Sequence, residues 1–599
     1  MTAPSPIAVG GSRVSFVIKA NGKDIDSSWQ VLSIDTHNTV NKVPRATVVL
    51  YDGSASERTF PISDSGTLKP GVKLQIAAGY DGKTASIFEG IIVRQGIEID
   101  TMSGSKLIIE AADKALGMTL ERSNAVFENV TDSDVISKLI TASGLSKDVA
   151  STSVKHEEIV QYYASDWDTM VTRAELCGMV VITTAAKVTV KPPDTSQSPV
   201  LSLEYGTSIL DLQAEIDSTT QYSSSALTSY SWDYGTQALV ESGPGTVSVK
   251  EPGKLSSTEL AKVFNVKKAP QQTGASLEKA ALQAWSSAEL LKSKLSKIRG
   301  RVRFQGTSLA ATGKTVELLG LGDQFNGNAY VSGVHHSIRD NFWTTTATIG
   351  LSYKWFAAEA PNIAAPGASG QLPPISGLQT GIVKQVGKDK AGEHRVAVSI
   401  PLLQAGSAVV WARVASFYAS NKVGAVFFPE VGDEVIVGFM NDDPRAPVIL
   451  GSVYSKKLAP PFPPDDKNNK KAIVTRSKLT LSFDEQNKII EISTPGKHTI
   501  KMDDKSGAIS IEDSNKNQIS LSKGGITLNS ASNIKITAKG NITLDAKGNL
   551  SATAAANATM EGLAVSHKAK TKFSAQGTAS AEVTSSGILT IRGTLVKIN

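Results

Sequence analysis

The residues that could carry chemistry are few and widely spaced in this chain of 599 residues. Of seven histidines, only His335 and His336 are adjacent. In a strand they face opposite ways, so we expect one packed and one solvated side chain. No HxH, HExxH or His/Cys cluster has the spacing of a zinc site. The sequence therefore predicts no metal and no cofactor in one chain. The open alternative is a metal on a threefold axis, held by His498 or His567 from each of three chains.

Two further groups invite a catalytic interpretation. Asp433 and Glu434 are adjacent carboxylates, but neighbouring side chains on a strand point apart and cannot share one proton transfer. Cys177 is the single cysteine, which excludes an internal disulfide framework. Cys177 lies on the apolar side of the end of a predicted helix, and the sequence places no base beside it. We therefore expect a buried thiol that does not act as a nucleophile. We therefore expect that the chain is not an enzyme.

Composition places the chain among globular proteins of several domains. Apolar residues make up 40% and charged residues 20%, and the net charge of +6 is small for this length. Such a charge does not suggest a nucleic-acid partner. No apolar run approaches the ~18 residues of a membrane span, and the start lacks the basic and apolar regions of a signal peptide. We expect synthesis in the cytoplasm, with any export carried out by a machine.

The first part of the chain, residues 1–365, is predicted to be mostly β. Alternating apolar and polar residues mark strands through residue 130, with a spacing that suits antiparallel barrels or sandwiches. Helices are predicted over 132–142, with Thr131 as N-cap, over 167–176, and over 277–297. Strands resume from residue 300. An Ala-, Pro-, Gly- and Ser-rich stretch then predicts a linker at 366–377.

A small barrel is predicted next, over residues 378–457. Five or six strands in about 80 residues suit a closed OB-fold barrel, and the run VGAVFFP (423–429) is one of the predicted strands. A second linker follows at 458–477. The rest, 478–599, consists of short strands with paired apolar residues.

The pairs lie two residues apart and recur every seven to ten residues, settling to eight in ITLNSASN, IKITAKGN and ITLDAKGN. Octads with two inward residues are too short for a single-chain β-helix, so we expect three chains to share the core, each pairing with its neighbours. An ordinary β-sandwich with a chance repeat is the alternative. The predicted trimer core comprises Ile526, Leu528, Ile534, Ile536, Ile542, Leu544, Leu589, Ile591, Val596 and Ile598.

The run FFPEVGDEVIVGFMNDDPRAPVILGSVY (427–454) resembles the signature of the gp5-like OB domain in VgrG-type spike proteins. The final LTIRGTLVKIN resembles the end of the VgrG needle. Upstream, SDWDTMVTRAELCGMVVI and GNAYVSGVHHSIRDNFWTTTATIGL resemble the gp27-like hub. The resemblance implies a tight turn at Gly432–Asp433, and its signature positions are Pro429, Gly432, Asp433, Pro444 and Gly451.

The resemblance implies a homotrimer at the centre of a contractile injection system baseplate. A hub with two tube-like β-barrels per chain would meet the inner tube or its initiator and the baseplate proteins. An intertwined trimeric β-helix would carry a PAAR-like tip protein, docked at Val596, Lys597, Ile598 and Asn599. Sheath contraction would drive the spike through an envelope, with transient membrane contact and possible effector cargo. The particle would be phage tail-like and extracellular, or docked at the cytoplasmic membrane in a type VI system.

Three alternatives stay open. The chain could be a type VI VgrG that carries effectors, although its short hub loops resemble extracellular contractile injection systems more closely. It could be a trimeric tail fibre or adhesin that binds a glycan; against this, Phe573 is the one aromatic residue between 500 and 599. A peptidoglycan hydrolase would need paired acids or a metal triad, and neither pattern is present.

Overall fold

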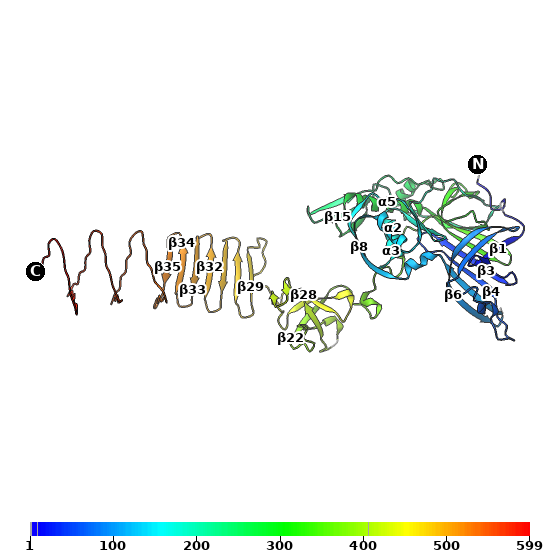
Figure 1. The fold of residues 1–599 in the computed structure, drawn as a ribbon. Coiled ribbons are helices and arrows are strands. Elements are labelled where there is room, and N and C mark those ends of the chain that lie inside the picture. The colour runs from blue at the N-terminus through cyan, green and yellow to red at the C-terminus, as the bar shows by residue number, and fades with distance from the viewer. Residues whose placement is uncertain (1–2, 9, 103, 405, 599) are drawn as a thin grey trace. The chain divides into compact units, whose positions relative to one another are not determined.

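A computed structural model describes residues 3–8, 10–102, 104–404 and 406–598. The chain divides into two compact units, Met1–Val453 and Tyr454–Asn599 (Figure 1). The mostly-β fold predicted from the alternating pattern is confirmed. No helix in the described ranges is long and apolar enough to cross a membrane.

One 13-stranded sheet forms the framework of residues 1–365, here called the hub. Its main path runs β14-β18-β21-β20-β3-β4-β7-β6-β5-β1-β2, and β13 and β19 join at β20. The strands are β1 (Val14–Ala20), β2 (Lys23–Asp24), β3 (Val31–Thr39), β4 (Arg45–Tyr51), β5 (Lys73–Tyr80), β6 (Lys83–Asp100), β7 (Gly104–Ala112), β13 (Leu201–Glu204), β14 (Ile209–Ile216), β18 (Ile298–Gln305), β19 (Thr315–Leu319), β20 (Gly327–Arg339) and β21 (Phe342–Ile349).

The sheet has two halves that meet where β20 pairs with both β21 and β3. Each half has its own core: Leu74 and Ile76 lie in one, Val302 and Phe304 in the other. Trp343 of β21 is buried in the first core and so ties the halves together. The family resemblance implies two tube-like barrels in this region, and the described strands form two separately packed halves of one continuous sheet.

A layer of helices and short sheets covers part of the hub. Thr131 and Asp134 form a reciprocal capping box at the start of α2, which therefore begins where the sequence predicted. The helix over 257–264 was not predicted. The helices are α1 (Pro61–Asp64), α2 (Asp132–Ala142), α3 (Asp166–Leu176), α4 (Ser257–Phe264), α5 (Lys279–Leu295) and α6 (Phe356–Glu359).

Three small sheets accompany these helices. They are the pair β10-β8, the sheet β11-β12-β9 and the sheet β16-β15-β17. Their strands are β8 (Arg122–Thr131), β9 (Ser146–Val149), β10 (Lys155–Ser165), β11 (Val180–Thr184), β12 (Lys187–Lys191), β15 (Leu227–Asp233), β16 (Ala238–Ser242) and β17 (Ala269–Thr273).

The predicted closed barrel is confirmed, with the order β22-β23-β24-β28-β27. Its valine-rich core includes Val383, Val398 and Val435. The predicted strand VGAVFFP is wrong. The barrel closes through the parallel pair β24–β28, so that run is not one of its strands. Only the first two residues of the run are paired, in a separate small hairpin of β25 (Ala419–Ser420) and β26 (Val423–Gly424). The barrel strands are β22 (Gln379–Val386), β23 (Val396–Ser399), β24 (Val410–Val414), β27 (Glu434–Phe439) and β28 (Pro447–Ser452).

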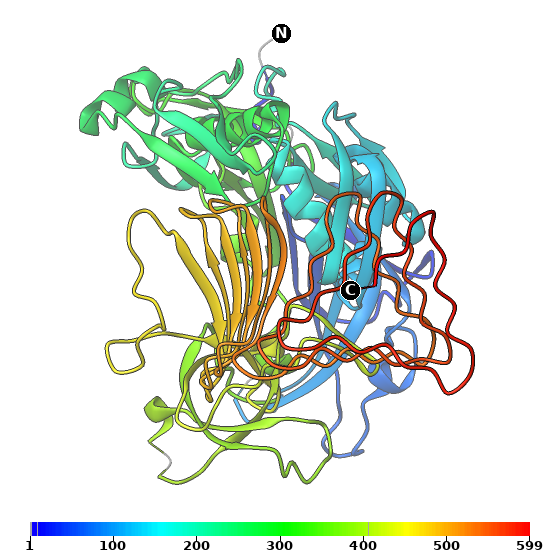
Figure 2. The ribbon, with the colours of Figure 1, turned by 90° about the vertical axis from the view of Figure 1, so that its left-hand side faces the viewer.

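The second unit begins with a seven-stranded antiparallel meander, here called the needle sheet. Figure 2 shows its strands side by side, with the chain winding on in repeated loops. The sheet starts at Lys470, inside the span predicted as a linker. Its strands are β29 (Lys470–Val474), β30 (Thr480–Asp484), β31 (Ile489–Ser493), β32 (Thr499–Asp503), β33 (Ala508–Glu512), β34 (Gln518–Ser522) and β35 (Gly525–Asn529).

The needle sheet pairs within one chain, whereas the sequence predicted pairing between chains. Up to β34, successive strands start nine or ten residues apart, which leaves four or five residues to return as a hairpin. From Ile526 the unit shortens to eight residues, and the described residues 530–598 contain no strand or helix. The change in spacing coincides with the loss of pairing within the chain.

Candidate assembly interface

One side of the needle sheet, here called the apolar face, carries large apolar side chains in two columns. Side chains alternate along each strand, and the hairpin register places apolar residues opposite one another: Ile500 lies opposite Ile511, and Met502 opposite Ile509. One column is Leu481, Ile492, Ile500, Ile511, Ile519 and Leu528; the other is Phe483, Ile490, Met502, Ile509, Leu521 and Ile526.

The apolar face is uncovered in the isolated chain. From Ile490 to Leu521 its side chains are each between 39% and 49% exposed. The opposite face carries polar residues such as Ser510 and Lys501, and Lys501 pairs with Asp503 at 3.1 Å. A continuous apolar strip of this length on one side of a polar sheet marks a contact surface for another chain.

A hollow of about 580 Å³ runs along one column of the apolar face. Ile492, Ile500, Ile511 and Ile519 line it, and Ile534 reaches it from beyond the sheet. His498 and Thr494 stand at its border. Its apolar lining suits side chains from a neighbouring chain.

The predicted core residues fall into two groups. Ile526 and Leu528 lie on β35 and are 73% and 57% exposed. The others lie beyond the needle sheet and are between 49% and 88% exposed: Ile534, Ile536, Ile542, Leu544, Leu589, Ile591, Val596 and Ile598. Lys597 is exposed, and Asn599 lies outside the described residues. Their inward position in a trimer and the docking role of 596–599 remain predictions.

The five signature positions of the barrel lie in or beside its turns and strands. Val431 and Gly432 form a reverse turn in which the Asp433 N–H donates to the Glu430 carbonyl at 3.0 Å. The Asp433 carboxylate accepts the Glu430 N–H at 2.8 Å, and Gly432 has φ of +96°. The predicted turn is confirmed. The Asp433 carboxylate serves the turn by accepting a backbone hydrogen bond.

The remaining signature positions also belong to turns or strands. Pro444 lies in the turn where Arg445 pairs with Asp443 at 2.7 Å. Gly451 lies opposite Ile436 beside an irregularity in the β27–β28 pairing. Pro429 precedes the turn at Gly432 and is half-buried.

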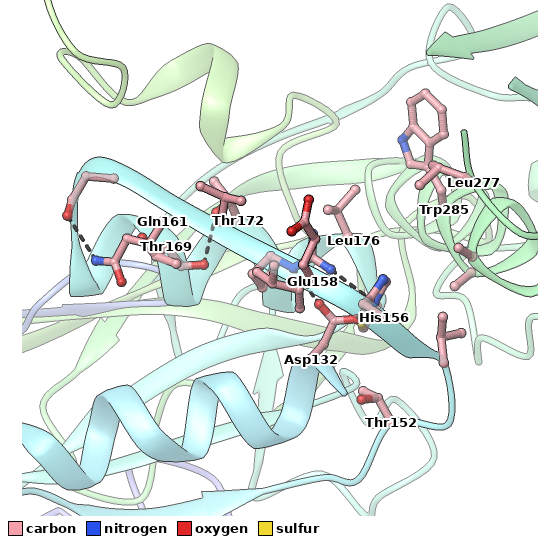
Figure 3. A pocket seen from close by; sticks show the side chains of 18 of the residues that line it. Asp132, Thr152, His156, Glu158, Gln161, Thr169, Thr172, Leu176, Leu277 and Trp285 are labelled. Atoms are coloured by element: carbon pink, nitrogen blue, oxygen red, sulfur yellow. Dashed lines mark hydrogen bonds and ion pairs between the residues drawn. The ribbon is translucent and has the colours of Figure 1, made fainter. Parts of the chain in front are cut away.

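The hub contains a cavity of about 830 Å³ between β10, α3 and α5 (Figure 3). At one end, Asp132 accepts hydrogen bonds from His156 Nε2 at 2.8 Å and from Arg173 Nε at 2.5 Å. Trp285 and Leu277 line the opposite wall. No sequence motif points to this bond, because 24 residues separate His156 from Asp132.

Cys177 borders the same cavity at the end of α3 and is half-buried. Burial raises the pKa of its thiol to about 12, and the nearby Asp132 carboxylate acts in the same direction. The thiol is therefore protonated at neutral pH and unsuited to nucleophilic attack. Within the described ranges, no group of three His, Cys, Asp or Glu residues is placed to hold a metal ion.

The adjacent histidines behave differently, as predicted. His336 is buried and its Nδ1 lies 2.9 Å from the Thr345 hydroxyl; burial lowers its pKa to about 3. His335 is partly exposed, bonds Asp35 at 3.0 Å and stacks on His37 with ring centroids 4.1 Å apart. The sequence did not predict that stack, because it depends on the pairing of β20 with β3.

Three family models match the chain in order. The first describes the Alg8 N-terminal domain and matches residues 11–340. The second describes the type VI secretion system/phage-baseplate injector OB domain and matches residues 379–454. The third describes the phage baseplate V C-terminal trimerisation domain and matches residues 489–566. The second and third matches are both to domains described from phage baseplates or type VI secretion systems.

The first match covers more than half of the chain, which therefore belongs to the Alg8 N-terminal domain family. Its two baseplate-type domains make the chain similar to VgrG-type spike proteins. The type VI secretion system spike protein VgrG3 of Vibrio cholerae is 36% identical over 81 residues, covering 13% of this chain and 8% of that protein. The actin cross-linking toxin VgrG1 of Vibrio cholerae is 33% identical over 75 residues, covering 12% and 7%. The matched segments are thus less than a tenth of these curated relatives.

Among solved structures, the Escherichia coli c3393 protein, a type VI secretion component with structural similarity to phage T4 gp27 and gp5, has a TM-score of 0.35. It is 14% identical and covers 73% of this chain and 99% of its own.

Proposed function

We propose that the chain is the structural central spike and hub of a contractile injection machine, and that it works as a homotrimer. The hub meets the inner tube and the baseplate, and the needle carries a PAAR-type tip. On sheath contraction the trimer transmits the axial force and pierces the target envelope. No catalytic step of its own is part of this proposal.

The observation that carries the proposal is the uncovered apolar face, in a region matched by a trimerisation domain. Two columns of apolar side chains cross β30 to β35, and burying such area contributes roughly 25 cal/mol per Å². Three chains that bring these faces to a common axis remove them from water. Loss of one chain would expose the other two, which makes the rod cooperative under load.

The two-part hub supports the proposed contact with a tube. Each chain contributes two separately packed halves of one sheet, so a trimer presents six such halves. Six halves on a threefold hub would match a sixfold tube, because a symmetric contact requires one half for each tube subunit.

An effector-carrying type VI spike is a second candidate. The barrel is compatible with this candidate, because the matching OB model covers both type VI secretion and phage-baseplate injectors. Cargo attached to the needle end would travel with the trimer in the same motion.

A genetic test follows from the structural role. Deletion of the gene in the source cell should abolish sheathed particles with a central spike in electron micrographs. The wild-type gene and Ser510→Asp, on the polar face, should restore them, and Ile511→Asp should not. Normal particles with spike density in the deletion strain would refute the proposed function.

A further inference from the structure

The segment between β24 and β27, here called the barrel loop (residues 416–429), projects large apolar side chains from the OB barrel. The exposed fractions are 89% for Phe417, 76% for Val426 and 62% for Phe427. Tyr418, Val423 and Phe428 are also exposed, at 54%, 57% and 43%. A cluster of this kind on a small barrel calls for a partner surface.

The barrel loop is ordered by its own hydrogen bonds. The Ala425 N–H donates to the Tyr418 carbonyl at 2.9 Å, and β25 pairs with β26 in a short hairpin. The Ser416 hydroxyl lies 3.1 Å from the Tyr418 carbonyl and 3.0 Å from that of Ala425, and so braces both arms. The apolar side chains are therefore held on a fixed scaffold, which lowers the ordering cost of a contact.

Charge favours a contact of the loop with copies of itself. Between Ser416 and Pro429, Lys422 is the single charged residue. A patch close to a rotation axis meets its own copies, and like charges there would repel. An almost uncharged, aromatic patch is free of that repulsion.

The short connection between the barrel and the needle sheet also favours a contact of the loop with copies of itself. Residues 453–469 separate β28 from β29, which is 17 residues and at most about 60 Å of extended chain. Once three needles associate, three barrels are confined together at an effective concentration on the order of millimolar. A weak apolar contact then forms without further cost in translational freedom.

We infer that the barrel loops of three chains pack against one another and form a second trimer contact, separate from the needle. This inference rests on the proposed trimer. It assigns Phe417, Val426 and Phe427 to a contact between copies of the chain.

Cysteine cross-linking of the full chain tests the contact. Val426→Cys places a thiol on an exposed position, whereas the native Cys177 is half-buried and its raised pKa keeps it unreactive toward maleimide at neutral pH. A short bis-maleimide should join two chains of each trimer and leave the third single. The yield should be the same at 0.1 and 10 µM protein, because the reaction occurs within one trimer. Lys390→Cys, exposed between β22 and β23, is the matched control and should stay uncross-linked.

Molar mass measured on the same samples separates the possible failures. A trimer that cross-links at 426 and not at 390 supports the inference. A trimer without a cross-link at 426 overturns it, assigns the barrel loop to a different protein and leaves the proposed function intact. A chain that stays single overturns both.

Discussion

Ile511 of β33 lies directly opposite Ile519 of β34, and in the isolated chain these side chains stay 44% and 40% exposed. The pair belongs to a column of apolar residues that continues across the needle sheet. Cross-strand pairs of this kind stabilise a sheet only weakly when one side faces water. In the proposed trimer, the column would gain its main stabilisation from the other chains that cover it.

Ile511→Asp should prevent trimer formation. The substitution brings three carboxylates into one apolar contact, where each uncompensated charge costs several kcal/mol. Ser510→Asp, the neighbour on the opposite face, adds the same charge toward solvent and should leave the trimer intact. Sedimentation velocity measures both variants; a trimeric Ile511→Asp chain would show that this face points outward.

Removal of residues 587–599 should abolish binding of a PAAR-type tip protein without dissociating the trimer. The segment contains Leu589, Ile591, Val596 and Ile598, whose apolar side chains are half to almost fully exposed in the isolated chain. The needle sheet and the octads before residue 587 remain to hold the chains together. Pull-down with the tip protein and mass photometry provide the two readouts. Undiminished tip binding would move the docking surface elsewhere.

Gly432→Ala should destabilise the barrel by about 1–2 kcal/mol, the cost of a positive φ for an L-residue. Gly432 has φ of +96° and open space around an added Cβ, so strain of the backbone is the sole expected effect. Gly451→Ala also meets open space, its φ lies outside the positive region, and it should change stability by less than about 0.5 kcal/mol. Urea unfolding monitored at Trp411 of β24 compares them. Equal destabilisation would contradict the turn assignment.

Acid should destabilise the hub through His336. Its pKa is about 3 in the folded hub and 6.5 in the reference state, because burial disfavours the charged ring. The unfolded chain therefore binds more protons between these values, and stability falls as pH falls below about 6.5. From pH 7 to 5 the loss is about 2 kcal/mol per chain. In His336→Gln, thermal unfolding should depend less steeply on pH over this interval; an unchanged slope would assign the acid sensitivity to other groups.

Local patterns in the sequence were sufficient to predict much of the fold. Thr131 and Asp134 mark the start of α2 because a capping box involves residues three apart. The strands of the barrel and needle follow from alternation with period two. These features depend on contacts between near neighbours, which composition and spacing encode directly.

Features that depend on distant pairing were not predictable in the same way. The bond of His156 to Asp132 and the stack of His335 on His37 arise only once the strands and helices are assembled. The run VGAVFFP has the composition of a strand, yet the parallel β24–β28 pair closes the barrel without it. Its apolar residues are explained by the proposed contact between chains.

The molar mass of the full chain in solution tests the central claim most directly. Light scattering coupled to size exclusion should give three times the chain mass of 63.1 kDa. The value should stay constant upon dilution into the nanomolar range, because the apolar faces of all three chains are buried together. A mass of one chain at all concentrations would contradict the trimeric spike.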